Sequence, residues 1–257
     1  MPGRGRRAPQ ADGRALRRLR EEANVAVSDG GGARRPYYPV FLDMRGKRAL
    51  VVGGGEVACR KAAGLMESGA RVTVVAKRPT AQMRAWADDG LVTLAERAYR
   101  PGDAAGMLLV YAATDDARAN EAVYAEAEAA GALANVVDDP AHCRFIVPSV
   151  VRRGLLQLAV STSGAAPALA KRLRRDLEER CPQDLAAYVE LLADVRALVK
   201  ERADGGEARR VSLLEAACDP ALFARFRAGE PLDAEAVLAE LFAGADGDAA
   251  REAGGFR

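Results

Sequence analysis

The chain has 257 residues, of which 49% are hydrophobic and 29% are charged, a composition typical of globular proteins with one sizeable core or two modest ones. Its net charge of +2 is close to balanced, and no stretch approaches the roughly 20 apolar residues that cross a bilayer. The N-terminus carries charge without the apolar core of a secretory signal. We therefore expect a cytoplasmic protein. Four widely spaced cysteines without a CxxC pair, and a single histidine, disfavour a disulfide framework or a resident metal.

The first 35 residues form a compositionally distinct segment. They carry nine arginines against four acidic residues and hold no aromatic side chain. Such a segment cannot bury enough surface to offset its ordering entropy, so 1–35 is predicted to be a disordered Arg/Gly-rich tail. A weak arm for nucleic acid or a partner protein is the alternative, although no aromatic residue interleaves with the arginines to favour nucleic acid.

Residues 36–143 alternate between strand and helix patterns. "RALVV" at 48–52 predicts a buried strand, a helix is expected from Glu56 to a glycine stop at Gly69, and "RVTVVA" at 71–76 predicts the next strand. Further strands are expected from Leu91, Met107 and Leu133, with a helix over 116–130. The alternation predicts an α/β, Rossmann-like doubly wound parallel sheet.

The remaining residues change pattern. Residues 144–182 hold two apolar runs around Arg152, Arg153 and Gly154, which indicate a hairpin, and then "STSG", which indicates a strand leading into a helix. Residues 183–257 are mostly helical in pattern. We expect a hairpin and substrate segment followed by a helical C-terminal region.

Three glycines follow the first predicted strand. Gly53, Gly55 and Ala58 satisfy G-x-G-x-x-A at a strand-to-helix junction, and Gly54 lies between them. Gly53 suits a tight turn, Gly55 lets backbone amides approach a pyrophosphate, and Ala58 allows close helix packing, with the helix N-terminus facing the anion. This pattern predicts a dinucleotide site; a glycine-rich turn without a ligand is the plainer alternative.

The end of the second predicted strand bears on the choice of nucleotide. NAD sites often place an acidic residue there for the ribose hydroxyls, but this chain has Lys77 and Arg78. These cations could accept a 2′-phosphate or form a solvated strand end. The spacing alone leaves NAD and NADP open.

Several ordered blocks resemble a known family. They are "GGGEVACRKAAGLMESGA", "AATDD" at 112–116, "NVVDDP" at 135–140, "FIVPSVV" at 145–151 and "STSGAAPALAKRLRRDLE" at 161–178. In this order they resemble the siroheme synthase family, specifically its precorrin-2 dehydrogenase and sirohydrochlorin ferrochelatase module, over roughly residues 37–180. The residues after 180 are too few and too helical for the methyltransferase domain to which this module is fused in some members, so we expect another protein to supply methylation.

The resemblance implies an activity. It implies oxidation of precorrin-2 to sirohydrochlorin with NAD, in siroheme biosynthesis, and in some members insertion of ferrous iron as a second reaction. It also implies homodimerisation through the hairpin, which agrees with the hazard of leaving an apolar hairpin exposed. Whether this chain is also a chelatase is left open by its motifs. The cofactor contacts implied are Gly53, Gly54, Gly55, Glu56, Val57, Lys77, Arg78 and Thr114.

Asp138 occupies the position of the family's catalytic carboxylate. Independently of the resemblance, dehydrogenation needs a base as well as a hydride acceptor, and Asp138 follows a strand whose carboxyl end faces the expected ligand crevice. The same base could accept pyrrole protons during metal insertion. The alternative is that Asp138 and Asp139 cap a turn before Pro140.

The "STSG" helix start indicates an anion site. Ser161, Thr162 or Ser163 could cap the helix, with Pro167 in its first turn. On one face of that helix lie three cations at positions i, i+3 and i+4: Lys171, Arg174 and Arg175. A tetrapyrrole with many carboxylates would be attracted to them, whereas a solvated face paired with neighbouring acids is the alternative.

Other assignments remain open at this point. His142 could be a second base or a metal contact, but a lone histidine is more often structural. A non-enzymatic NAD-binding redox sensor would explain the glycines without requiring Asp138. An NAD-dependent dehydrogenase of another anionic substrate is a third reading.

Overall fold

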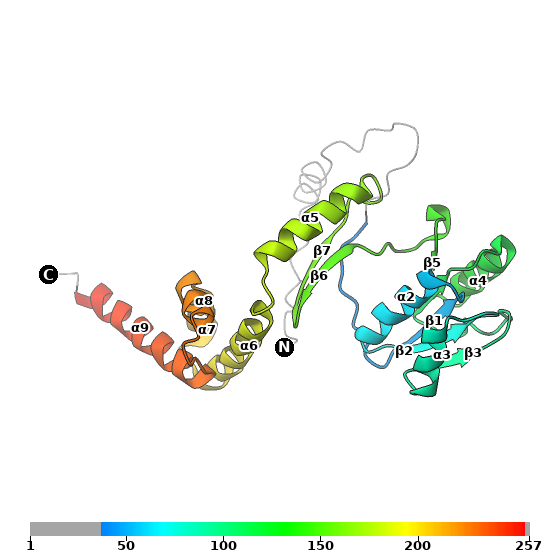
Figure 1. Cartoon of the computed structure of the whole chain (residues 1–257). Helices are drawn as coiled ribbons and strands as arrows, with labels where there is room; N and C mark the ends of the chain where they lie inside the picture. Colours follow the sequence, from blue (N-terminus) through cyan, green and yellow to red (C-terminus); the bar gives the residue numbers. More distant parts are fainter. Residues whose placement is uncertain (1–36, 255–257) are drawn as a thin grey trace, which may run out of the picture. The chain divides into compact units, whose positions relative to one another are not determined.

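The structure, a computed structural model, describes residues 37–254, so the tail predicted at 1–35 lies outside the described residues. The chain divides into two compact units, one ending at Ile146 and one beginning at Val147 (Figure 1). Each unit is considered by itself.

The first unit is built on a five-stranded sheet whose strands are all parallel, in the order β3-β2-β1-β4-β5. The strands are β1 Arg48–Val52, β2 Arg71–Val75, β3 Val92–Ala95, β4 Leu109–Ala112 and β5 Leu133–Val136. Val52 at the end of β1 is paired with Val75 of β2 and Ala112 of β4. The predicted strands and the parallel α/β fold are thus confirmed, and the carboxyl ends of the three central strands meet.

Helices cover both faces of this sheet. They are α2 Glu56–Glu67, α3 Ala81–Asp88 and α4 Ala117–Ala129. Val51 faces the cluster that contains α2 and α3, whereas Leu50 and Val52 face the cluster that contains α4. Strand order reverses between β1 and β4, and open α/β sheets bind ligands in the crevice at such a reversal.

The second unit contains a hairpin and five helices. Its elements are β6 Ser149–Arg153, β7 Leu156–Val160, α5 Pro167–Arg180, α6 Leu185–Arg202, α7 Gly206–Ala216, α8 Pro220–Arg227 and α9 Ala234–Gly254. The two strands are antiparallel and α5 packs on both, while α6 to α9 enclose a second core that includes Tyr188, Val195 and Leu213. The predicted hairpin and helical region are confirmed. Over residues 37–254, no helix has both the length and the apolarity needed to cross a membrane.

The start of α5 corrects one expectation. Ser161, Thr162 and Ser163 do not cap this helix, because its N-cap is Ala166 and Pro167 is the first helical residue. Thr162 Oγ1 accepts a hydrogen bond from the Ala166 amide at 3.0 Å, and Ser161 Oγ accepts one from the Ser163 amide at 3.0 Å. The hydroxyls therefore hold the preceding turn, and Pro167 sets where the helix begins.

Candidate functional site: a cleft at the carboxyl edge of the sheet

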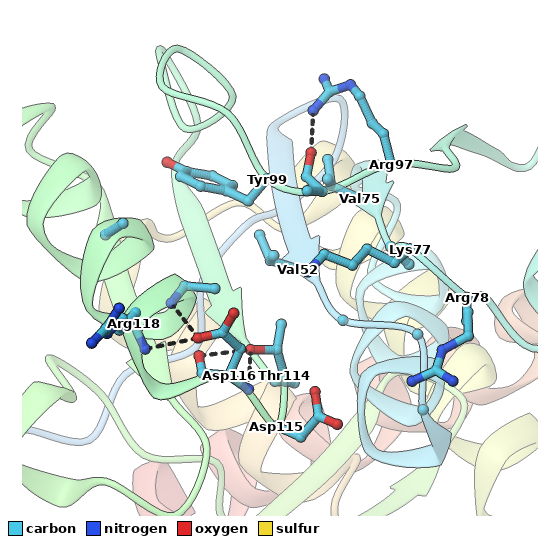
Figure 2. A pocket seen from close by; sticks show the side chains of 18 of the residues that line it. Val52, Val75, Lys77, Arg78, Arg97, Tyr99, Thr114, Asp115, Asp116 and Arg118 are labelled. Carbon is cyan, nitrogen blue, oxygen red and sulfur yellow. Dashed lines mark hydrogen bonds between the residues drawn. The ribbon is translucent and has the colours of Figure 1, made fainter.

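A cleft of about 1060 Å³ opens at the carboxyl ends of β1, β2 and β4 (Figure 2). The lining includes all eight residues predicted to contact the cofactor, namely Gly53, Gly54, Gly55, Glu56, Val57, Lys77, Arg78 and Thr114. The volume lies at the upper end of the range for small-molecule and cofactor sites. The structure therefore brings these residues together, and their contact with a nucleotide stays a prediction.

The glycine turn at the base of the cleft is sterically required. Gly53 has φ +137°, and a Cβ there would lie 2.3 Å from the carbonyl oxygen of Ala113. A Cβ on Gly54 would lie 2.1 Å from the carbonyl oxygen of Arg78. A Cβ on Gly55 would meet no atom within 4 Å. The first two glycines therefore let three loops meet, and the third keeps the approach to α2 open.

Helix α2 begins directly after this turn. Gly55 is its N-cap and supplies no side-chain hydrogen bond, so the first-turn amides have no side-chain acceptor at the cap. Unsatisfied amides and the helix dipole favour an anion at this position. The open approach at Gly55 and the amides of α2 fit the pyrophosphate of a dinucleotide, and the residues present are consistent with NAD.

The loop after β4 forms one side of the cleft. Thr114 Oγ1 donates to Asn120 Oδ1 at 2.7 Å, and Asn120 Nδ2 donates to the Thr114 carbonyl at 3.0 Å. Asp116 caps α4 by accepting from the Arg118 and Ala119 amides. Sequence reasoning missed Asn120; the signal was an amide in the first turn of the helix that follows "AATDD".

A second loop, between β3 and β4, forms the opposite side, as Figure 2 shows for Arg97 and Tyr99. Arg97 is fixed by two hydrogen bonds of 2.7 Å to Asp103. The Tyr99 hydroxyl donates to Glu126 Oε2 at 2.5 Å, and burial together with this carboxylate raises the pKa of Tyr99. Neither residue belongs to a sequence motif, so pattern reasoning had no signal for this wall.

Basic side chains follow β2 at the mouth of the cleft. Lys77 and Arg78 are both exposed and both line it. The Arg78 carbonyl approaches Gly54, which ties this segment to the glycine turn. The position is that of the adenosine ribose in a Rossmann-like site.

Asp138 lies beyond the end of β5. It is exposed, has φ 62°, and does not line the cleft. Within residues 37–254 its carboxylate has no hydrogen-bond partner. Capping of the turn was the alternative to a catalytic role for Asp138. It is Asp139 that caps this turn, because its Oδ1 accepts a hydrogen bond from the Ala141 amide at 3.1 Å. Asp138 is thus left available to a ligand, and its catalytic role stays a prediction.

His142 is held by its neighbours beside a separate cavity of about 210 Å³. Its Nδ1 lies 2.6 Å from Asp139 Oδ2 and its Nε2 lies 3.4 Å from Glu121 Oε2. The ring meets Tyr124 edge-on, with centroids 4.5 Å apart. The hydrogen bond to Asp139 raises the pKa of His142. These contacts favour the structural reading of this histidine.

The predicted substrate residues belong to the second unit. Lys171 and Arg175 are exposed on α5, whereas Arg174 forms an ion pair with Glu178 one turn along the helix. Arg153 of the hairpin donates to the carbonyls of Cys181 and Glu178 and so satisfies the end of α5. Ser161, Thr162 and Ser163 occupy the turn before that helix. Of the three predicted cations on α5, Lys171 and Arg175 thus remain exposed for an anion.

Comparisons with known proteins agree with this geometry. A family model described as NAD(P)-binding matches residues 40–149, and a model described as the central part of sirohaem biosynthesis proteins matches residues 153–180. A siroheme synthase of Nitrosococcus oceani is 42% identical over 79% of this chain and 43% of its own length. One from Pseudomonas paraeruginosa is 41% identical over 81% of this chain and 44% of its own length. The chain spans less than half the length of these curated relatives.

A solved structure extends the likeness. SirC, a precorrin-2 dehydrogenase, is matched with a TM-score of 0.66 and 28% sequence identity. The match covers 80% of this chain and 98% of that protein. The matched region therefore extends beyond the nucleotide-binding sheet into the second unit.

Proposed function

We propose that this chain, which belongs to the siroheme synthase family, catalyses the NAD-dependent oxidation of precorrin-2 to sirohydrochlorin. The observation that carries the proposal is the fold match to a precorrin-2 dehydrogenase over nearly all of that protein. The cleft supports it, because the glycine turn, the start of α2 and the Lys77 and Arg78 segment surround one continuous space. Bound NAD would supply the hydride acceptor.

The remaining chemistry falls to this chain. Oxidation removes two hydrogens from the substrate, one as a hydride and one as a proton. We assign the proton to Asp138, whose carboxylate is exposed and has no hydrogen-bond partner among residues 37–254. The network of Thr114 and Asn120 would hold the loop after β4 against the nucleotide. Glu56 and Val57 would lie beside the pyrophosphate at the start of α2.

The substrate proposed carries many carboxylates. Lys171 and Arg175 are exposed cations on α5 and would attract such an anion, whereas Arg174 is already paired with Glu178. Ser161, Thr162 and Ser163 would contact it through the turn before the helix. Replacement of Lys171 and Arg175 by glutamine should raise KM for precorrin-2 and leave NAD affinity unchanged.

Ferrous iron insertion is a second proposed activity. Metal insertion requires loss of two pyrrole protons, and the free carboxylate of Asp138 suits that step as well as the oxidation. Sirohydrochlorin and ferrous iron should then yield siroheme faster with the protein than without it. A rate equal to the protein-free control would restrict the chain to dehydrogenation.

We also propose a homodimer formed through the hairpin and acting in the cytoplasm. Among residues 37–254, the sheet of β6 and β7 consists of these two strands, and Val147 and Leu155 are exposed at its ends. Two-stranded sheets with open edges are stabilised by pairing with further strands. Light scattering during gel filtration should give a mass of two chains; a mass of one chain would contradict this proposal.

A substrate panel separates the dehydrogenase from its rivals. The purified protein with NAD would be given precorrin-2 and, in parallel, other anionic reduced substrates under anaerobic conditions. NADH formation with precorrin-2 alone supports the proposal. NADH formation only with another compound would indicate a different dehydrogenase, and NAD binding without turnover of any compound would favour a redox sensor.

A further inference from the structure

Lys61 is a half-buried cation on α2 that no motif singles out. Its Nζ lies 5.3 Å from the centroid of the Tyr111 ring on β4. Within residues 37–254, the ammonium group has neither a hydrogen-bond acceptor nor an ion-pair partner, and it lies over the aromatic ring. A cation–π contact leaves the ammonium's hydrogen-bonding capacity largely unused.

The surroundings of Lys61 connect it to the proposed catalytic carboxylate. Tyr111 is paired in register with Asn135 of β5, three residues before Asp138. Burial, followed by repulsion from Arg60, lowers the pKa of Lys61, and the charges of Cys143 and Asp138 oppose this shift. Asp138 thus follows the strand that is paired with Tyr111, and its charge is one of the influences on the pKa of Lys61.

The ammonium of Lys61 is half-buried and has no acceptor in the described part of the chain, so water hydrates its exposed side and an anionic ligand could replace that water. We propose that Lys61 binds a carboxylate of the tetrapyrrole substrate next to Asp138. The inference rests on the proposed function, because that function makes the ligand a polycarboxylate. A half-buried ammonium attracts a carboxylate more strongly than the exposed cations of α5 can, since solvent screens those more fully.

The chain offers a matched control for this assignment. Lys61→Met keeps the length and the packing on Tyr111 but removes the charge, Arg60→Met removes the same charge from the exposed neighbouring residue, and Lys61→Arg keeps it. The full-length protein would be titrated with uroporphyrin, a polycarboxylate porphyrin, in the presence of NAD, and binding followed by fluorescence. We expect Lys61→Met to weaken binding about tenfold, Arg60→Met less than about twofold, and Lys61→Arg to retain most of the affinity.

Salt and a chemical probe provide readouts that do not depend on the variants. The difference between wild type and Lys61→Met should shrink at high salt, as expected for an ionic contact. In the wild-type protein, bound uroporphyrin should protect Lys61 from an amine-acetylating reagent, measured by mass spectrometry. Should Lys61→Met unfold, this protection experiment still decides the matter.

Three results would overturn the inference: equal affinity in wild type and Lys61→Met, equal loss in Lys61→Met and Arg60→Met, or acetylation of Lys61 unaffected by the porphyrin. With precorrin-2 as substrate, Lys61→Met should raise KM about tenfold and change kcat less than about twofold. A wild-type protein that binds the porphyrin through Lys61 but forms no NADH would contradict the proposed function and not the binding role.

Discussion

Glu126 on α4 holds Tyr99 and the loop around it against the cleft. One carboxylate oxygen accepts the Tyr99 hydroxyl at 2.5 Å, and the other accepts the amides of Gly102 and Ala104 at 2.9 and 3.1 Å. Three donors from a loop without helix or strand thus converge on one side chain. Because Tyr99 lines the cleft, the carboxylate couples the stability of this loop to the shape of the nucleotide site.

Removal of the Glu126 carboxylate should destabilise the loop between β3 and β4 that lines the cleft. Glu126→Ala leaves two amides and a hydroxyl without their acceptor, so we expect a loss of about 1–3 kcal/mol in the free energy of unfolding and weaker NAD binding. Urea unfolding and calorimetric titration with NAD would measure both. Tyr99→Phe is the matched control, because it removes one hydrogen bond and keeps the other two. A loss in Glu126→Ala no larger than in Tyr99→Phe would show that the amide contacts contribute little.

The glycines of the turn should respond differently to alanine. Gly53→Ala combines a positive φ with a Cβ 2.3 Å from a backbone oxygen, so it should lower the free energy of unfolding by roughly 2–4 kcal/mol or prevent folding. The Cβ of Gly55→Ala would meet no atom within 4 Å, so the free energy of unfolding of this variant should lie within about 0.5 kcal/mol of the wild-type value. The same variant should bind NAD less tightly. Thermal unfolding and NAD titration distinguish the two. Normal NAD affinity in Gly55→Ala would argue against pyrophosphate binding at this position.

The pair of His142 and Asp139 should make stability depend on pH. The hydrogen bond raises the pKa of His142 above 6.5 and holds the pKa of Asp139 below 3.8. Because the pKa of His142 is raised on folding, its contribution to stability is fully present below pH 6.5 and is lost as pH rises through the pKa of the folded state. Because the pKa of Asp139 is lowered on folding, its contribution to stability is present above pH 3.8 and is lost as pH falls through the pKa of the folded state.

His142→Gln should therefore reduce the unfolding temperature most near about pH 5, between these two ordinary values, and less at about pH 8. Scanning calorimetry of both proteins across that range tests the sign. Glu121→Gln, which removes only the 3.4 Å contact, should have a smaller effect at each pH. A destabilisation by His142→Gln that grows from pH 5 to pH 8 would be inconsistent with a charged pair.

Local pattern predicted much of the fold and the near side of the cleft. Strand and helix positions follow from hydrophobic periodicity, and the glycine turn from a motif confined to six residues, so both could be read in the sequence. The side of the cleft formed by the loop between β3 and β4 could not be predicted from the sequence, because Tyr99 and Glu126 are 27 residues apart and meet only when the sheet forms. The requirement for glycine at position 54 likewise comes from a backbone segment after β2.

Neighbouring residues of similar type also limited what could be predicted about the site from the sequence. Asp138 and Asp139 are chemically alike, and only the left-handed backbone at Asp138 and the turn that follows show that Asp139 caps and Asp138 is exposed. The predicted cap of α5 was wrong for a related reason. Any of three hydroxyl residues could have been the cap, but the helix begins further along the chain, at Pro167. In both places the backbone dihedrals decide, and sequence spacing does not contain them.

The proposed oxidation depends on Asp138 as the base. Asparagine tolerates the left-handed backbone at this position and removes only the charge, so Asp138→Asn should fold and bind NAD like wild type. Asp139→Asn is the matched control, since it changes the adjacent carboxylate and its contact with His142. Both would be compared with wild type for NADH formation from precorrin-2 and NAD under anaerobic conditions.

We expect NADH and sirohydrochlorin absorbance with wild type, a rate at least about 100-fold lower with Asp138→Asn, and a rate within a few-fold of wild type with Asp139→Asn. Wild-type turnover that Asp138→Asn retains would remove Asp138 as the base. An absence of NADH from the wild-type protein, with NAD bound and precorrin-2 intact, would contradict the proposed dehydrogenase.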